Sequence, residues 1–296
     1  MSDRGLPDVA AELTAEVLVE AIPYMRRFAG KIVVVKYGGN ALYGSNGDES
    51  EALSLFAKDI VLMHAVGMLP VVVHGGGPQI GEMMTRLGKK PEFVDGLRVT
   101  DAETLDIVRM VLVGKVNRDI VGALNTHGHL AVGLSGEDAG FITASLRDPA
   151  LGFVGDVSAI DPTIVLRLTS QGLIPVVATI GADLAGQAYN INADTVAGEL
   201  AESMNAEKFL LLTDVSGIRS DPDDANSLLS SVSADELDSM IASGAVKDGM
   251  IPKAQALSHA VRNGVENAHV LDGRVPHALL LELFTERGLG TMVRPK

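Results

Sequence analysis

The chain of 296 residues contains no cysteine and no tryptophan, and it has only 7 phenylalanines and 4 tyrosines. The lack of cysteine excludes a disulfide framework, a thiolate metal site and a cysteine nucleophile. Few aromatic rings argue against base or sugar stacking as the main binding device. Basic residues are a minority too, with 24 Lys and Arg against 38 Asp and Glu, a net charge of −14. This balance excludes a basic field that would attract nucleic acid or an anionic membrane.

Long apolar runs are also missing. No uninterrupted apolar segment reaches the roughly 20 residues that span a bilayer, and residues 1–7 lack the pattern of a secretory signal. The composition, 47% hydrophobic and 21% charged, is typical of a globular protein. We therefore expect a soluble protein of the reducing cytoplasm, with one large or two modest domains.

Glycine, by contrast, is abundant, with 32 residues, many of them directly after short apolar runs. The runs that predict strands are Lys31–Lys36, Leu69–Val73, Leu130–Leu134, Leu173–Ala178, Phe209–Thr213 and Ala268–Leu271. Residues 52–66 have helical spacing, whereas Gly152–Val157 alternates and predicts a hairpin arm at an edge. Unbroken apolar strands between helices are typical of a parallel sheet covered on both faces. The sequence predicts an α/β fold, a three-layer αβα sandwich around a mainly parallel sheet.

A separate amphipathic helix is predicted before the first strand. Its apolar positions recur at steps of three and four: Ala10, Leu13, Val17, Ala21, Tyr24 and Phe28. Pro23 lies inside this pattern and is expected to kink the helix. Because the sheet does not need this element, it is either a packing helix on its own subunit or an oligomerisation arm.

Two glycine clusters follow the first two predicted strands, Gly38-Gly39 and Gly75-Gly76-Gly77. Glycine at the carboxyl end of a parallel strand lets backbone N–H groups approach a phosphate. Each cluster has a charged or polar neighbour, Lys36 and His74. A GxxxxGK[ST] motif is absent, and no G-x-G-x-x-G follows the first strand. The pattern therefore indicates an anion site other than a Walker A or Rossmann site.

Several single residues allow two interpretations. Lys36 ends an apolar strand, where a lysine either meets an anion or extends to solvent. Lys253 is either a second cation of the site or a solvated helix cap. Asp194 can cap the helix predicted at residues 195–204, which would make Asn190 an ordinary turn residue. Arg98 has the planar fork that suits a substrate carboxylate.

The motifs of hydrolytic and metal chemistry are missing. HExxH and GxSxG do not occur, and the pair His127 and His129 has no third ligand nearby in the sequence. No metal site is predicted.

Six motifs in one order resemble the amino acid kinase family, and within it the arginine-inhibited acetylglutamate kinases that carry an N-terminal helix. They are KYGGNA (36–41), HGGGPQI (74–80), GLRVTD (96–101), NINADTVAGELA (190–201), LLTDVSGI (211–218) and DGMIPKA (248–254). The resemblance runs from about Lys31 to the C-terminus. It implies catalysis by Lys36, Lys253 and Asp194, with Asp194 holding the two lysines. Substrate-binding residues would be Gly75, Gly76, Arg98 and Asn190. ATP-binding residues would be Gly38, Gly39, Thr213, Asp214, Gly249 and Met250.

The same resemblance implies ATP-dependent phosphorylation of the γ-carboxylate of N-acetyl-L-glutamate, giving N-acetylglutamyl 5-phosphate in arginine biosynthesis. Mg²⁺ would arrive with ATP, and no tightly bound cofactor is implied. Residues 31–192 would form the lobe for the acyl amino acid and residues 193–296 the nucleotide lobe. The alternatives are a related carboxylate or carbamate kinase, acting for example on an aminoadipate derivative, and a catalytically silent sensor of amino acids or nucleotides.

Regulation and assembly are implied in the same way. Residues 1–30 would be the oligomerisation helix of a hexamer, a trimer of dimers, that arginine inhibits. The arginine site would lie in the C-terminal segment and the helix, at Tyr24, His269, Glu282 and Gly288.

Overall fold

The computed structural model describes residues 11–38, 48–94, 96–224, 226–247, 249–286 and 288–296. Its helices are α1 (Ala11–Phe28), α2 (Glu49–Ala65), α3 (Gly77–Arg86), α4 (Ala102–Arg109), the π-helix η2 (Met110–Val116), α5 (Asn117–Asn125), the 3₁₀ turns η3 (Asp138–Gly140) and η4 (Pro149–Leu151), α6 (Thr163–Ser170), α7 (Ala193–Ser203), α8 (Ala234–Ala242), α9 (Met250–Arg262) and α10 (Ala278–Phe284). Its strands are β1 (Ile32–Tyr37), β2 (Leu69–His74), β3 (Phe93–Val94), β4 (Leu97–Arg98), β5 (Ala131–Ser135), β6 (Ile142–Leu146), β7 (Val154–Ile160), β8 (Ile174–Ala178), β9 (Ile180–Ala182), β10 (Ala188–Ile191), β11 (Lys208–Thr213), β12 (Ser231–Ser233), β13 (Asn267–Asp272) and β14 (Thr291–Arg294).

Within the described chain, eight strands form one sheet in the order β12-β14-β13-β11-β1-β2-β8-β5. Neighbouring strands are parallel except β13 and β14, which are antiparallel. Val34 of β1 lies opposite Val71 of β2 on one side and Phe209 of β11 on the other. The predicted parallel sheet is confirmed, and each predicted strand is found to within one residue at either end.

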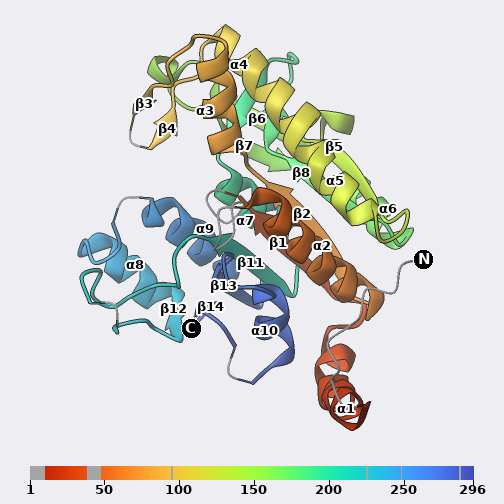
Figure 1. Ribbon diagram of the computed structural model, residues 1–296. Coiled ribbons are helices and arrows are strands. Elements are labelled where there is room, and N and C mark those ends of the chain that lie inside the picture. Colours follow the sequence, from red (N-terminus) through yellow and green to blue (C-terminus); the bar gives the residue numbers. More distant parts are fainter. Residues whose placement is uncertain (1–10, 39–47, 95, 225, 248, 287) are drawn as a thin grey trace.

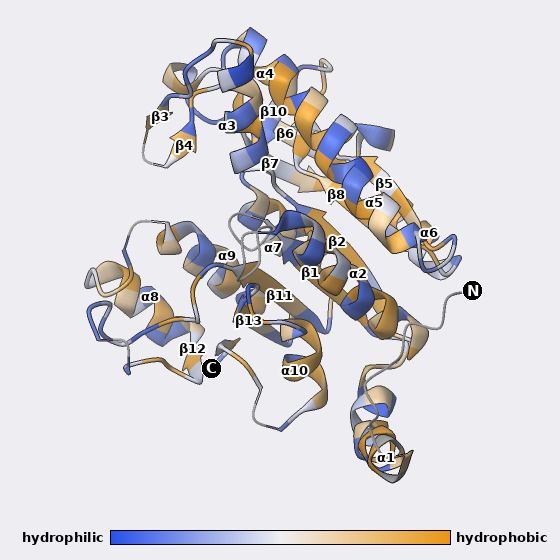
Figure 2. Ribbon diagram, viewed as in Figure 1, coloured by the Kyte–Doolittle hydropathy of each residue, from blue (hydrophilic) through white to orange (hydrophobic). Residues whose placement is uncertain are grey.

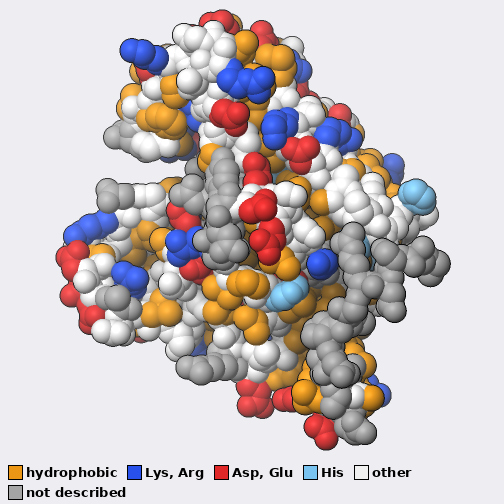
Figure 3. All heavy atoms as spheres, in the orientation of Figure 1, with side chains coloured by type: hydrophobic (Ala, Val, Ile, Leu, Met, Phe, Trp, Pro, Cys, Tyr) orange, Lys and Arg blue, Asp and Glu red, His pale blue; other side chains and the backbone are white. Residues whose placement is uncertain are grey.

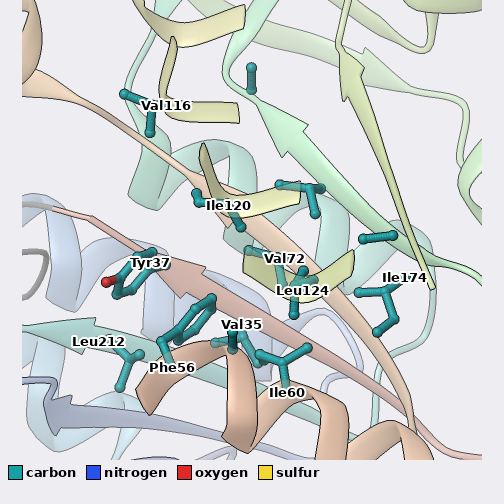
Figure 4. Packing of buried hydrophobic residues seen from close by; sticks show 14 of the residues in the cluster. Val35, Tyr37, Phe56, Ile60, Val72, Val116, Ile120, Leu124, Ile174 and Leu212 are labelled. Atoms are coloured by element: carbon teal, nitrogen blue, oxygen red, sulfur yellow. The ribbon is translucent and has the colours of Figure 1, made fainter. Parts of the chain in front are cut away.

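Alternation along β1 divides the core into two layers. Val33, Val35 and Tyr37 point to the face covered by α2 and α5, whereas Val34 belongs to the core cluster on the opposite face, which α7 and α9 cover. Figure 4 shows the first layer, where the Tyr37 and Phe56 rings stack with centroids 3.9 Å apart. Figure 2 shows the helices turning hydrophobic faces toward the sheet. The helix–sheet–helix sandwich follows from β-branched strands that are apolar on both faces.

A smaller ring of strands lies beside the main sheet, in the order β10-β7-β6-β9 (Figure 1). The strands β6 and β7 form an antiparallel hairpin, which agrees with the alternating pattern at residues 152–157. The expectation of an edge position is wrong, because β10 pairs with β7 on its other side through Asn190 and Val154. This pairing carries Asn190 toward the carboxyl end of the main sheet.

The helix α1 projects from the lower end of the molecule and contacts α10 (Figure 1). It runs through Pro23 as one helix. Its large apolar side chains at the surface, from 43% to 64% exposed, are Leu13, Val17, Leu18, Val19 and Ile22. Figure 3 shows hydrophobic side chains on its surface. None of the helices in the described ranges is both long and apolar enough to cross a membrane.

Candidate active site

One buried carboxylate joins two lysines from distant parts of the chain. Lys36 Nζ lies 2.8 Å from Asp194 Oδ1, and Lys253 Nζ donates to Asp194 Oδ2 at 2.8 Å. The side chains of Lys36 and Asp194 are 7% and 5% exposed, and that of Lys253 is 21% exposed. Lys36 follows Val34 at the strand period of two, so it reaches the α7 face of the sheet. The three predicted catalytic residues therefore form one cluster.

The simpler interpretations of Asp194 and Lys253 are wrong. Asn192, not Asp194, is the N-cap of α7, because its side chain accepts from the backbone N–H groups of Asp194 and Thr195. Asp194 is thereby free to project from the first helical turn toward the lysines. Lys253 lies in the first turn of α9, where an ion pair to Asp194 replaces the solvated position expected of a cap.

The cluster carries excess positive charge. Burial by itself raises the pKa of Asp194, but the charges of Lys36 and Lys253 and their hydrogen bonds outweigh burial and hold that pKa to about 2. The carboxylate is therefore ionised at neutral pH and faces two ammonium groups. One positive charge is left over in a largely buried place, which favours an anionic ligand.

The glycine loops after β1 and β2 meet beside Lys36. A Cβ placed on Gly38 would lie 3.1 Å from Lys36 Nζ and 3.4 Å from the backbone nitrogen of Gly75. On Gly75 it would lie 3.3 Å from the Ala193 Cβ. Side chains at these positions would crowd the lysine and the start of α7. Gly39 lies outside the described residues.

Arg98 and Asn190 line the same pocket as the glycines. The predicted residues around it are Lys36, Gly75, Gly76, Arg98, Asn190 and Asp194. The Arg98 guanidinium donates to the Gly77 carbonyl at 2.8 Å and lies over the Phe93 ring at 4.7 Å. Asn190 Nδ2 donates to Thr100 Oγ1 at 3.4 Å. The guanidinium also donates to Met84 Sδ at 3.2 Å, but no carboxylate of the described chain pairs with Arg98, so its remaining donors are available to an anion.

His74 is the polar neighbour that the sequence indicates for the second glycine cluster. It lies at the end of β2, directly before the glycines, but it is fully buried, and burial, together with the charges of Arg118 and Lys36, lowers its pKa to about 4. It is therefore a neutral polar neighbour of the glycine loop at physiological pH. Its partner Asn117, also fully buried, gave no signal in the sequence.

A second hollow lies near the start of α9. It holds two of the residues predicted to bind ATP, Asp214 and Met250. Thr213 lies beside it and donates from Oγ1 to Asp214 Oδ1 at 3.2 Å, and Gly249 precedes α9 as its N-cap. The sequence did not identify the basic residues of this hollow, which are Arg219, Lys247 and Arg274.

Three of the four predicted regulatory residues, His269, Glu282 and Gly288, lie together around Lys208, which the sequence did not indicate. Lys208 Nζ donates to His269 Nε2 at 2.8 Å, and His269 Nδ1 lies 2.8 Å from Glu282 Oε1. Glu282 Oε2 accepts from the Leu289 N–H at 2.7 Å, and a Cβ on Gly288 would lie 2.9 Å from that oxygen. The cluster is buried, and burial lowers the pKa of both Lys208 and His269.

The helix α1 reaches this cluster through Phe28, whose ring lies 5.6 Å from Lys208 Nζ. Tyr24 lies one turn earlier on α1 and is half-buried. Away from these sites, His259 Nε2 lies 3.3 Å from Glu199 Oε1 and 2.9 Å from Glu202 Oε2. These three groups of α7 and α9 are close enough together to hold one metal ion, but they do not line the pocket of the two lysines.

The sequence pattern of the amino acid kinase family matches residues 31–272. Acetylglutamate kinase from Symbiobacterium thermophilum is 54% identical over 288 residues, covering 94% of this chain and 97% of the relative. Acetylglutamate kinase from Halorhodospira halophila is 52% identical over 297 residues, covering 96% of each chain.

Solved structures show the same fold. N-acetylglutamate synthase from Neisseria gonorrhoeae, complexed with coenzyme A and N-acetyl-glutamate, superimposes with a TM-score of 0.82 at 26% identity. That match covers 95% of this chain and 63% of the longer synthase chain. Carbamate kinase from Giardia superimposes with a TM-score of 0.69 at 16% identity, over 90% of this chain and all of the kinase.

Proposed function

The chain belongs to the amino acid kinase family, and we propose that it transfers the γ-phosphoryl group of ATP to the γ-carboxylate of N-acetyl-L-glutamate, in arginine biosynthesis. One observation carries the chemical part of this proposal. Two lysines share a single buried carboxylate at the edge of a pocket that also holds an arginine, which pairs with no carboxylate among the residues that the structure describes. A site of this kind suits a reaction in which both substrates and the transferring group are anions.

The lysines supply charge stabilisation. As the substrate oxygen bonds to the γ-phosphorus, the bond to the β-phosphate oxygen breaks and ADP leaves with that electron pair. Negative charge on the moving group is neutralised by Lys36 from β1 and Lys253 from α9, which Asp194 holds on either side of itself. Removing one preorganised donor of this kind costs about 10²–10³-fold in rate.

The acyl amino acid is bound by the remaining residues of the pocket. The Arg98 fork pairs with a carboxylate of N-acetylglutamate, and Asn190 adds a polar contact in the pocket that Gly75 and Gly76 also line. The attacking carboxylate is already ionised at neutral pH, because a free carboxyl has a pKa of about 4. No general base is needed, which agrees with a neutral His74.

The nucleotide lies on the side of Lys253, in the hollow of Asp214 and Met250, with Thr213 and Gly249 at its border. Gly38, which lies beside Lys36, approaches its phosphates. Mg²⁺ accompanies ATP and is held by phosphate and water oxygens, since both oxygens of Asp194 face lysines. In this arrangement residues 31–192 form the acyl amino acid lobe and residues 193–296 the nucleotide lobe.

Arginine inhibition is part of the proposal. The cluster of Lys208, His269 and Glu282 offers a carboxylate for a guanidinium, and Gly288 leaves room beside it. Tyr24 is included in the proposed site because Phe28, one turn later on α1, lies 5.6 Å from Lys208 Nζ. The exposed apolar side chains of α1 support its role as an oligomerisation helix in a cytoplasmic hexamer, a trimer of dimers.

The test is ADP release with ATP and Mg²⁺, comparing N-acetyl-L-glutamate with glutamate, N-acetylaminoadipate, aspartate and carbamate. We expect the highest kcat/KM with N-acetyl-L-glutamate. Preference for N-acetylaminoadipate or carbamate would keep the chemistry and overturn the substrate. A folded protein that binds ATP and turns over nothing in the panel would instead be a sensor.

A further inference from the structure

His74 has a complete set of hydrogen bonds, which fixes its tautomer. Its Nε2 lies 3.0 Å from Asn117 Nδ2, and its Nδ1 lies 2.9 Å from the Gly75 carbonyl oxygen. An amide nitrogen only donates, so Nε2 accepts and the ring proton is on Nδ1. His74 therefore donates from Nδ1 to the carbonyl of the next residue.

Asn117 is held just as firmly. Its amide nitrogen also donates to the Val176 carbonyl of β8 at 2.8 Å, and its Oδ1 accepts from Arg118. The two buried side chains thus link strand β8, the start of α5 and the loop after β2. Nothing in the proposed mechanism uses this link.

The hydrogen bond from His74 to the Gly75 carbonyl determines the direction of the Gly76 N–H group. The Gly75 carbonyl and the Gly76 N–H belong to one trans peptide plane, so they point in opposite directions. His74 holds the carbonyl on the side of its own ring. The N–H consequently faces away from the His74 ring, and in the described chain it donates to no protein acceptor. Gly76 lines the pocket of Lys36 and Asp194.

The π-helix η2 supports the same peptide from behind. A Cβ on Gly76 would lie 2.7 Å from Leu112 Cδ2 and 3.2 Å from Val116 Cγ2, so these side chains pack beside Gly76 and leave no room for a side chain there. Both residues belong to η2, and Asn117 follows it directly. The wider π turn changes the direction of the residues that follow it, and π turns of this kind are frequent at functional sites. Here it sets both the backing of Gly76 and the position of Asn117.

We propose that His74 is a positioning residue: fixed by Asn117, it holds the Gly75–Gly76 peptide so that the Gly76 N–H faces the phosphoryl group during transfer. This inference rests on the proposed function. If the peptide turned over, a carbonyl oxygen would face the anionic group in place of an N–H donor. His74 thus prevents a repulsive arrangement without touching substrate itself.

The test compares two variants of nearly the same shape, His74→Leu and His74→Asn, in the full-length protein. Asn keeps an N–H donor where Nδ1 lies in histidine, whereas Leu has the same branching and no donor. With N-acetyl-L-glutamate and ATP we expect His74→Leu to lower kcat about 10²-fold, and KM for ATP to change less than about threefold. His74→Asn should recover at least about tenfold of that loss.

A matched control comes from His64 in the last turn of α2. Its Nε2 also forms a hydrogen bond with a backbone carbonyl, that of Gly172. His64→Leu should leave kcat within about twofold of the wild type, because the bond it removes lies far from the pocket. Thermal unfolding is measured for every variant. If His74→Leu does not fold, Asn117→Ser takes its place, and a fall in kcat of about tenfold at unchanged KM is expected.

The inference is overturned if His74→Leu keeps kcat within about threefold of the wild type, or if His74→Asn is as slow as His74→Leu, since packing alone would then explain the loss. Asn117→Ser with a wild-type kcat would overturn it as well. Failure of the proposed function looks different: the wild-type protein itself would turn over no N-acetyl-L-glutamate.

Discussion

Lys253 Nζ lies 2.8 Å from one oxygen of Asp194, and the other oxygen of that carboxylate lies 2.8 Å from Lys36 Nζ. The carboxylate therefore sets the distance between two cations that come from opposite ends of the sequence. Its position in the first turn of α7 is in turn set by the Asn192 cap. Substitutions can separate the roles of these residues. The two lysines contribute charge, Asp194 sets the distance between them, and Asn192 aligns Asp194.

Replacing Lys253 with methionine removes one cation and keeps most of the stem volume. We expect kcat to fall by about 10²–10³-fold, because a preorganised charge at the transferring group is lost, with the thermal unfolding midpoint little changed. The measurement is steady-state ADP release alongside circular dichroism. Lys89→Met is the matched control, since Lys89 makes surface ion pairs to Asp101 and Glu103. A Lys253→Met enzyme with wild-type kcat would remove this lysine from the mechanism.

The pKa of Asp194 predicts how stability depends on pH. Its folded value of about 2 lies below the usual value of 3.8, so the ionised carboxylate stabilises the fold fully above about pH 4 and loses that effect as the pH falls toward 2. The shift corresponds to about 2 kcal/mol. Asp194→Asn does not titrate, so the difference in unfolding free energy between wild type and variant should shrink from pH 6 to pH 3. Urea unfolding at several pH values measures it, and a constant difference would contradict the prediction.

Arg98 tests recognition of the acyl amino acid. Arg98→Lys keeps the charge but loses the fork, so KM for N-acetyl-L-glutamate should rise about tenfold to a hundredfold, with KM for ATP changed much less. Arg86→Lys, at the exposed end of α3, is the control and should behave as wild type. Equal rises of both KM values would mean that Arg98 supports the fold of the pocket instead.

Glu282 tests the arginine site. Glu282→Gln removes the negative charge beside His269 that would pair with a guanidinium. The arginine concentration that halves activity should increase at least about tenfold, as expected when a buried charged hydrogen bond is lost. Glu286→Gln, exposed on the same segment, should leave arginine inhibition unchanged. If arginine does not inhibit the wild-type enzyme even at millimolar concentration, the regulatory proposal fails.

The apolar surface of α1 predicts self-association. Val17 is 56% exposed in the single chain, and Val17→Glu places a charge on that surface. Sedimentation velocity should then show a species smaller than the wild-type assembly, for which we propose a hexamer, because a buried unpaired charge is costly at an interface. Glu16→Gln, next to Val17, is the control and should keep the wild-type sedimentation coefficient. A wild-type protein that sediments as a monomer would itself contradict the assembly.

The main sheet was predictable because most of its strands are long enough for each to show an apolar pattern of its own in the sequence. A run such as Leu69–Val73 is apolar on both faces and is followed within two residues by glycine, and the structure places it within a residue of expectation. The ring of short strands was mostly missed for the opposite reason. The strand β9, Ile180–Ala182, has three residues with a glycine at its centre, so its pairing depends on neighbours from other parts of the chain.

The sequence predicted which residues form the site, but it did not predict their burial, their protonation or their hydrogen-bond partners. Asn192 and Asp194 are both good capping residues, and only the helix start distinguishes them. The neutral state of His74 follows from complete burial, which the sequence does not reveal. Lys208 was missed because a lysine at the start of a strand is usually a solvent-facing residue. Its partners come from β13 and α10, far along the chain.

The strand order has a consequence for how the protein is made. The central strand β1 has β2 on one side and β11 on the other, and β11 begins only at Lys208. At about 5–20 residues per second on the ribosome, β11 is synthesised on the order of ten seconds after β2. During this interval one side of a strongly apolar strand has no hydrogen-bonding neighbour, the condition under which nascent chains pair wrongly. The second part of the chain thus supplies the strand that completes the pairing of β1, a strand made early in synthesis.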